Sequence, residues 1–307
     1  MYVIGGHTVK KGEFNLIGNV CPDLYMFDFN SKQWSKSDLY RLPLTEHTSV
    51  EINGVIYILG GLRSFFSIRH YYDYSNTVYK MDTNNMEEGL QLIHDAPWGK
   101  RSTLTATVYD NNKIIIFGGS NGRIDKELYF NDCWLFDTSN NEWTELSPLD
   151  NNNNNNENKN VNIPVSRCYH LAGIYKEELY IYGGYTGSVY LNDMWKFTIK
   201  TRKWTNISKL CKNVPPPRSR SACVVKDNIM FVLSGWYRKG YYQDFYSFDF
   251  ETYIWKRIDT GKFKTPNLSQ HSMVLKDDII YIYGGFNADN MQESDQFLFC
   301  KLQYNTL

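Results

Sequence analysis

The feature that most constrains the fold is a glycine pair that ends a short apolar segment and recurs along the whole chain. MYVIGG, IYILGG, IIIFGG, LYIYGG and IYIYGG all end this way, and FVLSG has Ser234 in place of the first glycine. The second glycine falls at positions 6, 61, 119, 184, 235 and 285, at spacings between 50 and 65 residues. A period near 50 residues predicts stacked supersecondary units.

Each unit reads as four short strands, which we name a to d. Strand a has segments such as HTSVEI and HSMVL, strand b ends in the glycines, and strands c and d carry the aromatic residues. Aspartate precedes tryptophan by six residues at the c–d turn three times, Thr198 takes the aspartate position once, and the second unit has Asp82 and Glu88 instead. Strand b is apolar on both faces, so its sheet must be covered on both sides, and radial repetition meets that need.

The glycine pair needs a physical explanation. Glycine has no Cβ, so it tolerates a positive φ and lets other groups approach closely. We expect the pair to turn strand b sharply while a Trp or Tyr of strand c or d packs against the bare backbone. The tryptophans at the d positions are predicted core aromatics, and the aspartate is expected to bond nearby backbone N–H groups at the turn.

These residues resemble the kelch repeat, and the resemblance covers essentially all 307 residues. It implies an all-β fold, a six-bladed kelch β-propeller with four-stranded antiparallel blades in a single domain. The blades are expected at approximately 1–41, 42–96, 97–149, 163–210, 214–262 and 266–307. The structural repeat residues are Gly5, Gly6, Gly60, Gly61, Gly118, Gly119, Gly183, Gly184, Gly235, Gly284, Gly285, Trp34, Trp143, Trp204 and Trp255.

Two segments depart from the repeat. Only 22 strands are clear where six blades need 24, because the first blade lacks strand a and the last lacks strand d. We therefore expect an incomplete seam, with residues upstream of Met1 supplying the missing strands. Residues 150–162 form an Asn-rich insertion, and such a composition cannot bury enough apolar surface to order itself. We predict that residues 151–160 are disordered and can be deleted at little cost.

Composition limits the partners. The chain has 33 basic and 33 acidic residues and a net charge of zero, which argues against nucleic-acid or anionic-membrane binding. It has no apolar run of membrane-spanning length and no signal-peptide pattern at its start, so we predict no membrane insertion. The six scattered cysteines contain no CxxC pair, which is typical of reduced thiols in a cytoplasmic protein. No cofactor is expected.

Two residue columns in strand a leave alternatives open. His47, His170 and His271 share one column with Leu104 and Ser221. They could form a metal-binding ring, or each imidazole could bond backbone within its own blade; no carboxylate or cysteine repeats with the column. Three residues earlier, Arg101, Arg167 and Arg218 could brace the repeat or contact a ligand, since a guanidinium suits either role.

The functional prediction is a non-enzymatic interaction module. No GxSxG, HExxH or phosphate-binding loop is present, although a metal-dependent or lyase-like kelch enzyme remains the alternative. The resemblance implies that the face made by the b–c and d–a loops binds a protein or peptide. Aromatic and arginine residues are common interface anchors, yet long loops can also bury their own rings. The predicted partner-binding residues are Arg63, Arg69, Tyr71, Tyr72, Arg238, Tyr241 and Tyr242.

Overall fold

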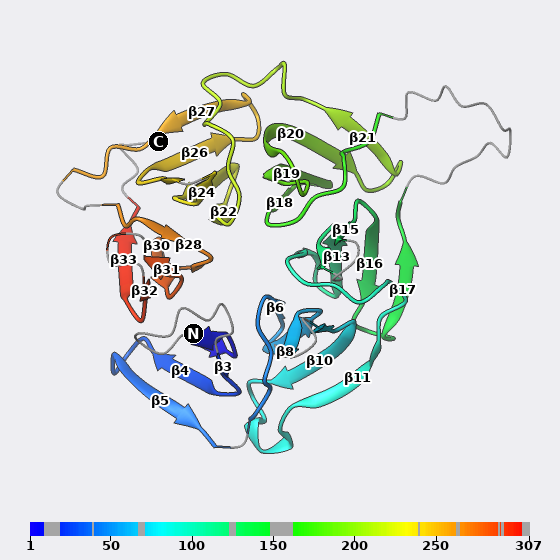
Figure 1. Cartoon of the computed structure of the whole chain (residues 1–307), viewed down its shortest axis with the longest axis vertical. Helices are drawn as coiled ribbons and strands as arrows, with labels where there is room; N and C mark the ends of the chain where they lie inside the picture. The colour runs from blue at the N-terminus through cyan, green and yellow to red at the C-terminus, as the bar shows by residue number, and fades with distance from the viewer. Residues whose placement is uncertain are drawn as a thin grey trace, which may run out of the picture. The chain divides into compact units, whose positions relative to one another are not determined.

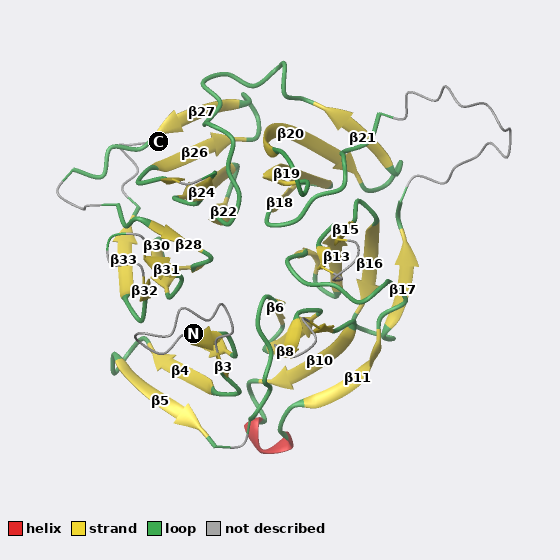
Figure 2. Ribbon diagram, in the orientation of Figure 1, coloured by secondary structure: helices red, strands yellow, loops and turns green. Residues whose placement is uncertain are grey.

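A computed structural model describes residues 1–8, 19–38, 40–66, 71–122, 127–147, 162–238, 240–261, 265–287, 289 and 292–302. Within these residues the fold is all-β. The one helical element is a 3-10 turn, η1 (Met86–Glu88), drawn in red in Figure 2. Residues 150–161 of the predicted Asn-rich insertion lie outside the described residues. The chain divides into two compact units: Met1–Phe130 with Leu135–Thr144, and Asn131–Trp134 with Glu145–Leu307.

Six antiparallel blade sheets follow one another along the chain (Figure 1), which confirms the predicted six-bladed class. The first unit holds blades one and two and most of blade three. Blade one is β1 (Tyr2–Ile4), β4 (Leu24–Asp28) and β5 (Gln33–Ser37). Blade two is β6 (Thr48–Ile52), β7 (Val55–Leu59), β10 (Thr77–Asp82) and β11 (Gln91–Asp95). Blade three is β12 (Thr105–Asp110), β13 (Lys113–Phe117), β16 (Cys133–Asp137) and β17 (Glu142–Glu145).

The second unit continues the same order. Blade four is β18 (Leu171–Tyr175), β19 (Glu178–Tyr185), β20 (Tyr190–Thr198) and β21 (Lys203–Asn206). Blade five is β22 (Ala222–Lys226), β23 (Ile229–Leu233), β26 (Phe245–Asp249) and β27 (Ile254–Arg257). Blade six is β29 (Ser272–Lys276), β30 (Ile279–Tyr283) and β33 (Phe297–Lys301). Among the described residues, blades one and six thus have three strands each, matching the count made from the sequence.

Strand b forms the core of blades two to five, as its apolar sequence predicts, whereas β1 of blade one is half-buried and burial alternates along β30 of blade six. The four residues Ile56–Leu59 are all buried, and so are the equivalent residues of β13, β19 and β23. The c–d turns also match expectation: Asp28 Oδ1 accepts hydrogen bonds from the backbone N–H groups of Asn30 and Ser31, at 2.6 and 3.1 Å. Aspartate therefore closes this turn in the way Asx side chains commonly do.

The prediction for the tryptophans holds only in part. Trp204 and Trp255 are buried, and Trp143 is half-buried against Phe136, with ring centroids 4.5 Å apart. Trp34 is wrong as a core residue, because its side chain is 37% exposed. It lies on β5, where every residue from Gln33 to Lys36 is exposed, whereas the tryptophan is the buried residue of the equivalent edge strands β21 and β27.

The glycine pairs have the predicted positive φ but a different packing partner. Gly60 and Gly61 have φ of 65° and 101°, and a Cβ on Gly61 would lie 2.9 Å from the carbonyl oxygen of Thr45. The expected Trp or Tyr is not among the nearest groups at these glycines. The pair instead allows two backbones to meet, since Gly61 N–H donates to the Arg101 carbonyl of blade three at 2.9 Å.

The same backbone bond recurs between consecutive blades within each unit. Gly6 N–H donates to the Leu44 carbonyl at 2.9 Å, and Gly184 N–H to the Arg218 carbonyl at 2.8 Å. The glycine pair is thus a joint between a blade and the start of strand a in the next blade. At Gly60 and Gly184 a Cβ would lie 2.8 Å from a backbone carbonyl oxygen, that of Arg101 and of Cys168 respectively, so a side chain there would displace the backbone.

Candidate protein-interaction face

A second small pairing lies beyond each glycine pair, where the sequence indicated only loops. The b–c connections form hairpins rather than irregular loops. They are β2 (His7–Thr8) with β3 (Asn19–Val20), β8 (Leu62–Phe66) with β9 (Tyr71–Tyr74), β14 (Ser120–Gly122) with β15 (Glu127–Tyr129), and β24 (Trp236–Tyr237) with β25 (Gly240–Tyr241). In blade four the long strands β19 and β20 themselves extend into the hairpin, and in blade six β31 (Phe286–Asn287) pairs with both β32 (Gln292–Glu293) and β28 (Leu268–Ser269).

These hairpins pair with the segment that enters strand a of the same blade. Bridges join Thr45 to Leu62, Ser102 to Ser120, Cys168 to Tyr185 and Ser219 to Trp236. The b–c hairpin and the end of the d–a loop therefore lie together in each of these blades. This pairing fixes the backbone of what we call the hairpin face, the surface that each unit makes with its own b–c hairpins and d–a segments.

One residue in each d–a segment has an unusual backbone conformation. The residue immediately before the histidine column has φ between 51° and 57° in blades two to six, and none is glycine: Glu46, Thr103, Tyr169, Arg220 and Gln270. Their backbones are linked from blade to blade, since Arg220 N–H donates to the Tyr169 carbonyl and Gln270 N–H to the Arg220 carbonyl, at 3.1 and 2.9 Å. Positive φ at non-glycine residues persists where surrounding structure over-determines it, often at functional sites.

The arginine column is a layer of structural braces, which decides between the two roles left open by the sequence. Arg218 is 1% exposed and makes a bidentate ion pair with Asp244 at 2.7 and 2.8 Å, while its Nη1 also donates to the Ser234 carbonyl at 3.1 Å. Arg167 repeats this arrangement with Asp193 at 2.7 and 2.8 Å. Burial alone would lower the pKa of Arg218, but the Asp244 carboxylate outweighs it and raises that pKa.

Arg101 and Arg63 show two variants of the brace. Arg101 is 2% exposed, donates to the Gly118 carbonyl at 3.1 Å and lies 3.7 Å from the centroid of the Phe130 ring. In blade two leucine occupies the arginine position, and Arg63 from the β8 hairpin donates to Thr77 Oγ1 at 2.7 Å and to the Tyr79 hydroxyl at 3.3 Å. Arg63, predicted to bind a partner, is therefore half-buried and engaged with strand c of its own blade.

The second predicted cluster separates into two environments. Arg238 is exposed on the β24–β25 hairpin, with its guanidinium carbon 5.2 Å from the Tyr237 ring centroid. Tyr241 is half-buried and stacks on Trp236, with centroids 5.9 Å apart and planes 8° apart. Tyr242 points instead to the brace layer: its hydroxyl donates to the Pro217 carbonyl at 3.1 Å and Arg218 lies 4.4 Å from its ring centroid.

The first predicted cluster is only partly within the described structure. Arg69 lies outside the described residues. The backbones of Tyr71 and Tyr72 belong to β9, where they pair with Phe66 and Phe65, and their side chains are not described.

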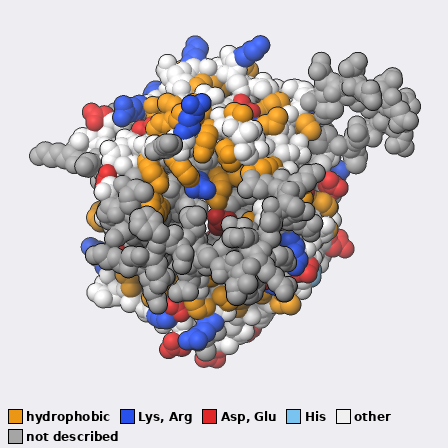
Figure 3. All heavy atoms as spheres, in the orientation of Figure 1, with side chains coloured by type: hydrophobic (Ala, Val, Ile, Leu, Met, Phe, Trp, Pro, Cys, Tyr) orange, Lys and Arg blue, Asp and Glu red, His pale blue; other side chains and the backbone are white. Residues whose placement is uncertain are grey.

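The second unit carries two sets of aromatic contacts on its hairpin face. The Trp236–Tyr241 stack extends to Phe286 of blade six, 6.1 Å from Tyr241. On the other side, Tyr190 of blade four contacts Tyr237 with centroids 5.4 Å apart. Figure 3 shows hydrophobic side chains gathered with Lys and Arg side chains over this part of the second unit. All five of these rings are half-buried, and aromatic residues are common among interface anchors.

Arg220 is the residue of this face that sequence reasoning missed. Its guanidinium carbon lies 4.5 Å from the ring centroids of both Tyr169 and Trp236, so the cation is stacked between two aromatic rings. The sequence segment RSR contains both Arg218 and Arg220, and only the first fits the repeating column. The signal in the sequence that could have indicated Arg220 is a second arginine two residues after a column arginine. The positive φ that sets its direction has no sequence signature.

The histidine column matches neither reading in full. His170 and His271 are 4% and 6% exposed, and His47 is half-buried. Neither ring nitrogen of His271 has a hydrogen-bond partner among the described residues, so this imidazole does not bond its own backbone as one reading expected. Burial lowers the pKa of His271 to about 4 and that of His170 to about 3. No three His, Cys, Asp or Glu side chains in the described part of the chain are grouped as metal ligands.

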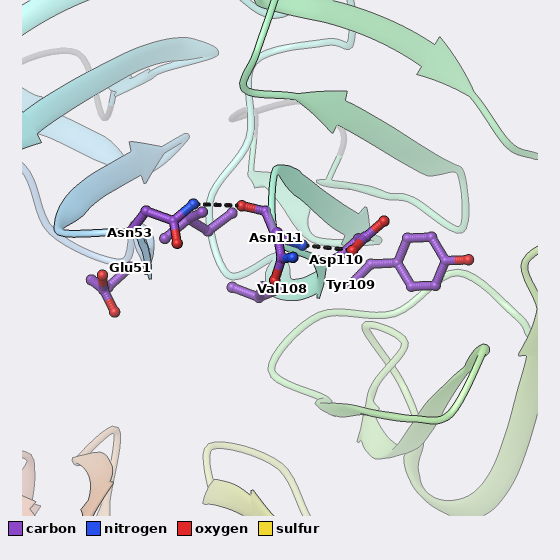
Figure 4. Close-up of a pocket in the computed structure, with 7 residues that line it drawn as sticks. Glu51, Asn53, Val108, Tyr109, Asp110 and Asn111 are labelled. Carbon is purple, nitrogen blue, oxygen red and sulfur yellow. Dashed lines mark hydrogen bonds between the residues drawn. The ribbon is translucent and has the colours of Figure 1, made fainter.

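A cavity of about 320 Å³ lies at the other end of the sheets of the first unit, at the a–b turns of blades two and three. Its lining is Glu51, Ile52, Asn53, Val108, Tyr109, Asp110 and Asn111 (Figure 4). Asn53 Nδ2 donates to the Asn111 carbonyl at 2.9 Å and ties the two turns together. Glu51 and Asp110 each accept a backbone N–H within their own turn, from Gly54 at 2.5 Å and Asn111 at 2.8 Å. These polar groups are engaged in hydrogen bonds that stabilise the two turns.

Comparison with known proteins places the chain in a family. The KLHDC2/KLHL20/DRC7 Kelch-repeats domain model matches residues 1–159 and 46–285, which together include most of the chain. The chain therefore belongs to the kelch-repeat family, and its blades are kelch blades.

Several curated proteins are similar over most of the chain. The leucine-zipper-like transcriptional regulator 1 homolog of Drosophila melanogaster is 24% identical over 97% of this chain and 29% of its own length. Kelch domain-containing protein 1 of Mus musculus is 25% identical over 97% of this chain and 63% of its own length. Kelch domain-containing protein 10 of Xenopus tropicalis is 26% identical over 76% of this chain and 53% of its own length. The chain thus spans between about a third and two thirds of these relatives.

Two further observations concern the whole described chain. All six cysteines are free thiols, and burial raises the pKa of Cys211 to about 11 and that of Cys223 to about 12. In the described residues no helix is long and apolar enough to cross a membrane.

Proposed function

We propose that this chain is a non-enzymatic interaction module of a cytoplasmic protein, whose hairpin face binds a protein or peptide. The observation that carries the proposal is the set of half-buried aromatic rings on blades four, five and six, which contact one another on hairpins paired with the d–a segments. Rigid aromatic side chains give large contact area at low entropic cost, and they dominate interface energetics. The kelch relatives support an interaction role in general terms.

The proposal is tested by selecting peptides from a displayed random library with the full chain and measuring their affinities by calorimetry. A double variant of the β24–β25 hairpin, Tyr237→Ala with Arg238→Ala, should weaken binding by about 2 kcal/mol if it removes an anchor. The matched control is Leu92→Ala, because Leu92 is 63% exposed on β11, an edge strand of blade two. Selected peptides that bind the double variant as well as wild type would move the site to another surface.

The alternative is a metal-dependent or lyase-like kelch enzyme. Metal analysis of the purified protein separates the two functions directly. A transition metal bound at one equivalent per chain, retained after dialysis, would support the alternative. The proposed interaction module requires peptide binding that is unchanged by a chelator.

A further inference from the structure

One segment of the second unit concentrates positive charge that the balanced composition of the whole chain hides. Residues 194–226 contain nine basic residues and no acidic one, although the chain as a whole has 33 of each. The zero net charge argued against anionic-membrane binding only because it averages over this segment. What decides such binding is how many of these cations are exposed and unpaired on one surface.

Five of the nine basic side chains are engaged within the fold. Lys196, Arg218 and Lys226 form ion pairs, Arg220 is stacked between two rings, and Arg202 donates to a backbone carbonyl. The other four are exposed and make no ion pair in the described part of the chain: Lys200, Lys203, Lys209 and Lys212. Half of this positive charge is thus left to solvent.

The connection between blades four and five brings three of these lysines to one edge of the second unit. Lys203 lies on β21, the last strand of blade four, and the chain then runs outside β27, the last strand of blade five (Figure 1). Lys212 N–H donates to the Tyr253 carbonyl and the Lys212 carbonyl accepts from Trp255 N–H, both at 3.0 Å. These two backbone bonds hold the connection along β27.

Strand β27 adds two more cations at the same edge, since Lys256 and Arg257 are both exposed. Neither makes an ion pair among the residues that the structure describes. We call the surface of these five side chains the basic rim: Lys203, Lys209, Lys212, Lys256 and Arg257. Figure 3 shows Lys and Arg side chains at this edge of the second unit.

A turn in the same connection exposes an apolar side chain among the lysines. The N–H groups of Leu210 and Cys211 both donate to the Ile207 carbonyl, at 2.9 and 3.2 Å. Residues four apart lie on the same side of such a turn, and Ile207 is buried while Cys211 packs against the core of blades four and five. Lys209 is therefore exposed on the outer side of the turn together with Leu210, whose side chain is 58% exposed.

The rim of the first unit has the opposite charge. Its exposed ionised residues on η1, β11 and β17 are acidic: Glu87, Glu88, Asp95 and Glu142. Positive charge is therefore a property of one edge of this molecule and does not follow from the kelch repeat, whose last strands are built alike in both units.

We propose that the basic rim, together with Leu210, adsorbs to a membrane surface rich in anionic phospholipid headgroups. Lysine ammonium groups are flexible, strongly hydrated point charges, which suit a diffuse layer of negative headgroups. Several such charges add in their attraction to an anionic leaflet, and an apolar side chain beside them contributes by entering the boundary below the headgroups. The basic rim lies outside the hairpin face, so this inference is independent of the proposed function.

Two other anionic partners fit the basic rim less well. Surfaces that bind single-stranded nucleic acid add aromatic side chains on which bases stack, whereas Trp204 and Trp255 of the rim strands are buried. Carboxylates of an acidic protein are best matched by the planar fork of arginine, and four of the five cations here are lysines. Neither partner would use the exposed Leu210 as a lipid surface does.

The test is co-sedimentation of the full chain with vesicles of phosphatidylcholine alone and of phosphatidylcholine with phosphatidylserine at about 3:1. It compares wild type, the double variant Lys209→Gln with Lys212→Gln, and Leu210→Ser. The matched control is Lys100→Gln with Lys301→Gln, which makes the same change in net charge at two exposed lysines outside the basic rim.

At low ionic strength wild type should bind the phosphatidylserine vesicles about tenfold or more better than phosphatidylcholine alone, and added salt should weaken this binding. Each lysine at an anionic surface contributes about fivefold, so the rim double variant should bind about 25-fold more weakly. Leu210→Ser should lose about fivefold, the effect expected for covering about half of a leucine side chain. The control should bind nearly as wild type does.

Three results would overturn the inference: no preference for phosphatidylserine vesicles, equal losses in the rim variant and the control, or binding of duplex DNA or polyglutamate through the rim without vesicle binding. Thermal unfolding of each variant shows whether lost binding reflects lost folding. The selected peptides should bind the rim variants as they bind wild type. If no peptide binds the hairpin face while the vesicles still bind through the rim, the proposed function fails and this inference stands.

Discussion

Two arginines in blade five, two residues apart, have opposite surroundings. Arg218 is buried, and its guanidinium donates to both Asp244 carboxylate oxygens and to the carbonyls of Ser234 and Pro216. Arg220 is half-buried, is stacked between two rings and keeps its donor edge unused. The difference shows that one short segment contributes to two parts of the blade. Arg218 belongs to the layer of buried brace arginines, Arg101, Arg167 and Arg218, whereas Arg220 belongs to the hairpin face.

Removing the brace should have the largest effect on stability. Arg218→Leu leaves the Asp244 carboxylate, which is 7% exposed, without its counter-charge. Breaking a buried pair by removing one partner costs about 3–5 kcal/mol in the free energy of unfolding, measured by chemical denaturation.

Blade six supplies the matched control for this prediction, because it has Leu268 at the arginine position and Gln296 at the aspartate position. The double variant Arg218→Leu with Asp244→Gln should therefore be more stable than Arg218→Leu alone. If the double variant is as unstable as the single one, the loss comes from packing around the arginine and not from the uncompensated charge.

The pH dependence of stability should reveal the buried histidines beneath the hairpin face. His271 takes up a proton near pH 6.5 when unfolded but only at about pH 4 when folded. Between these values the unfolded state binds more protons, so the free energy of unfolding falls as the pH falls, by up to about 1.4 kcal/mol per pH unit for this residue.

His271→Leu tests this prediction, since Leu104 occupies the same column in blade three. The variant should show a shallower loss of stability between pH 6.5 and pH 4 in urea denaturation series. Equal slopes for wild type and variant would mean that His271 is accessible to protons in the folded state.

The contrast between the two arginines also shows which parts of the molecule could be predicted from sequence. The blade sheets could be predicted, because strand b is apolar on both faces, as in Ile56–Leu59, and the glycine pair recurs with it. The brace arginines were found by their column, but the sequence left bracing and ligand contact as alternatives, since Asp193 and Asp244 lie 26 residues further along the chain, on or just before strand c.

The hairpin face was harder to predict for a different reason. The direction of the backbone decides which side chains reach this face. Tyr241 stacks on Trp236 and Tyr242 points to the brace arginines, although the two tyrosines are adjacent in sequence. Alternation along a short strand sends successive side chains to opposite sides. The register of β24 and β25 could not be known from a loop sequence rich in aromatic residues.

That pair of tyrosines allows a sharper comparison with smaller effects. Tyr242→Phe removes the hydroxyl that donates to the Pro217 carbonyl and should lower the free energy of unfolding by about 1 kcal/mol. Tyr241→Phe should change it by less than about 0.5 kcal/mol, because in the described structure the Tyr241 hydroxyl has no hydrogen bond. Both free energies of unfolding are measured by denaturation under the same conditions. Equal losses in the two variants would show that the two tyrosine hydroxyls do not differ in their contribution to stability.

The smallest effect on stability is expected at Arg220 itself. Arg220→Met removes two stacked cation–π contacts, each worth about 0.5 kcal/mol at a partly exposed site, and replaces the side chain with one that can still pack between the rings. The free energy of unfolding should therefore fall by about 1 kcal/mol or less, close to the result for the control Arg257→Met. A residue that contributes little to stability yet is fixed by backbone bonds to both neighbouring blades is suited to contact a partner. A loss of about 3 kcal/mol or more in Arg220→Met would instead make this arginine another brace, and the difference between the two layers of blade five would no longer hold.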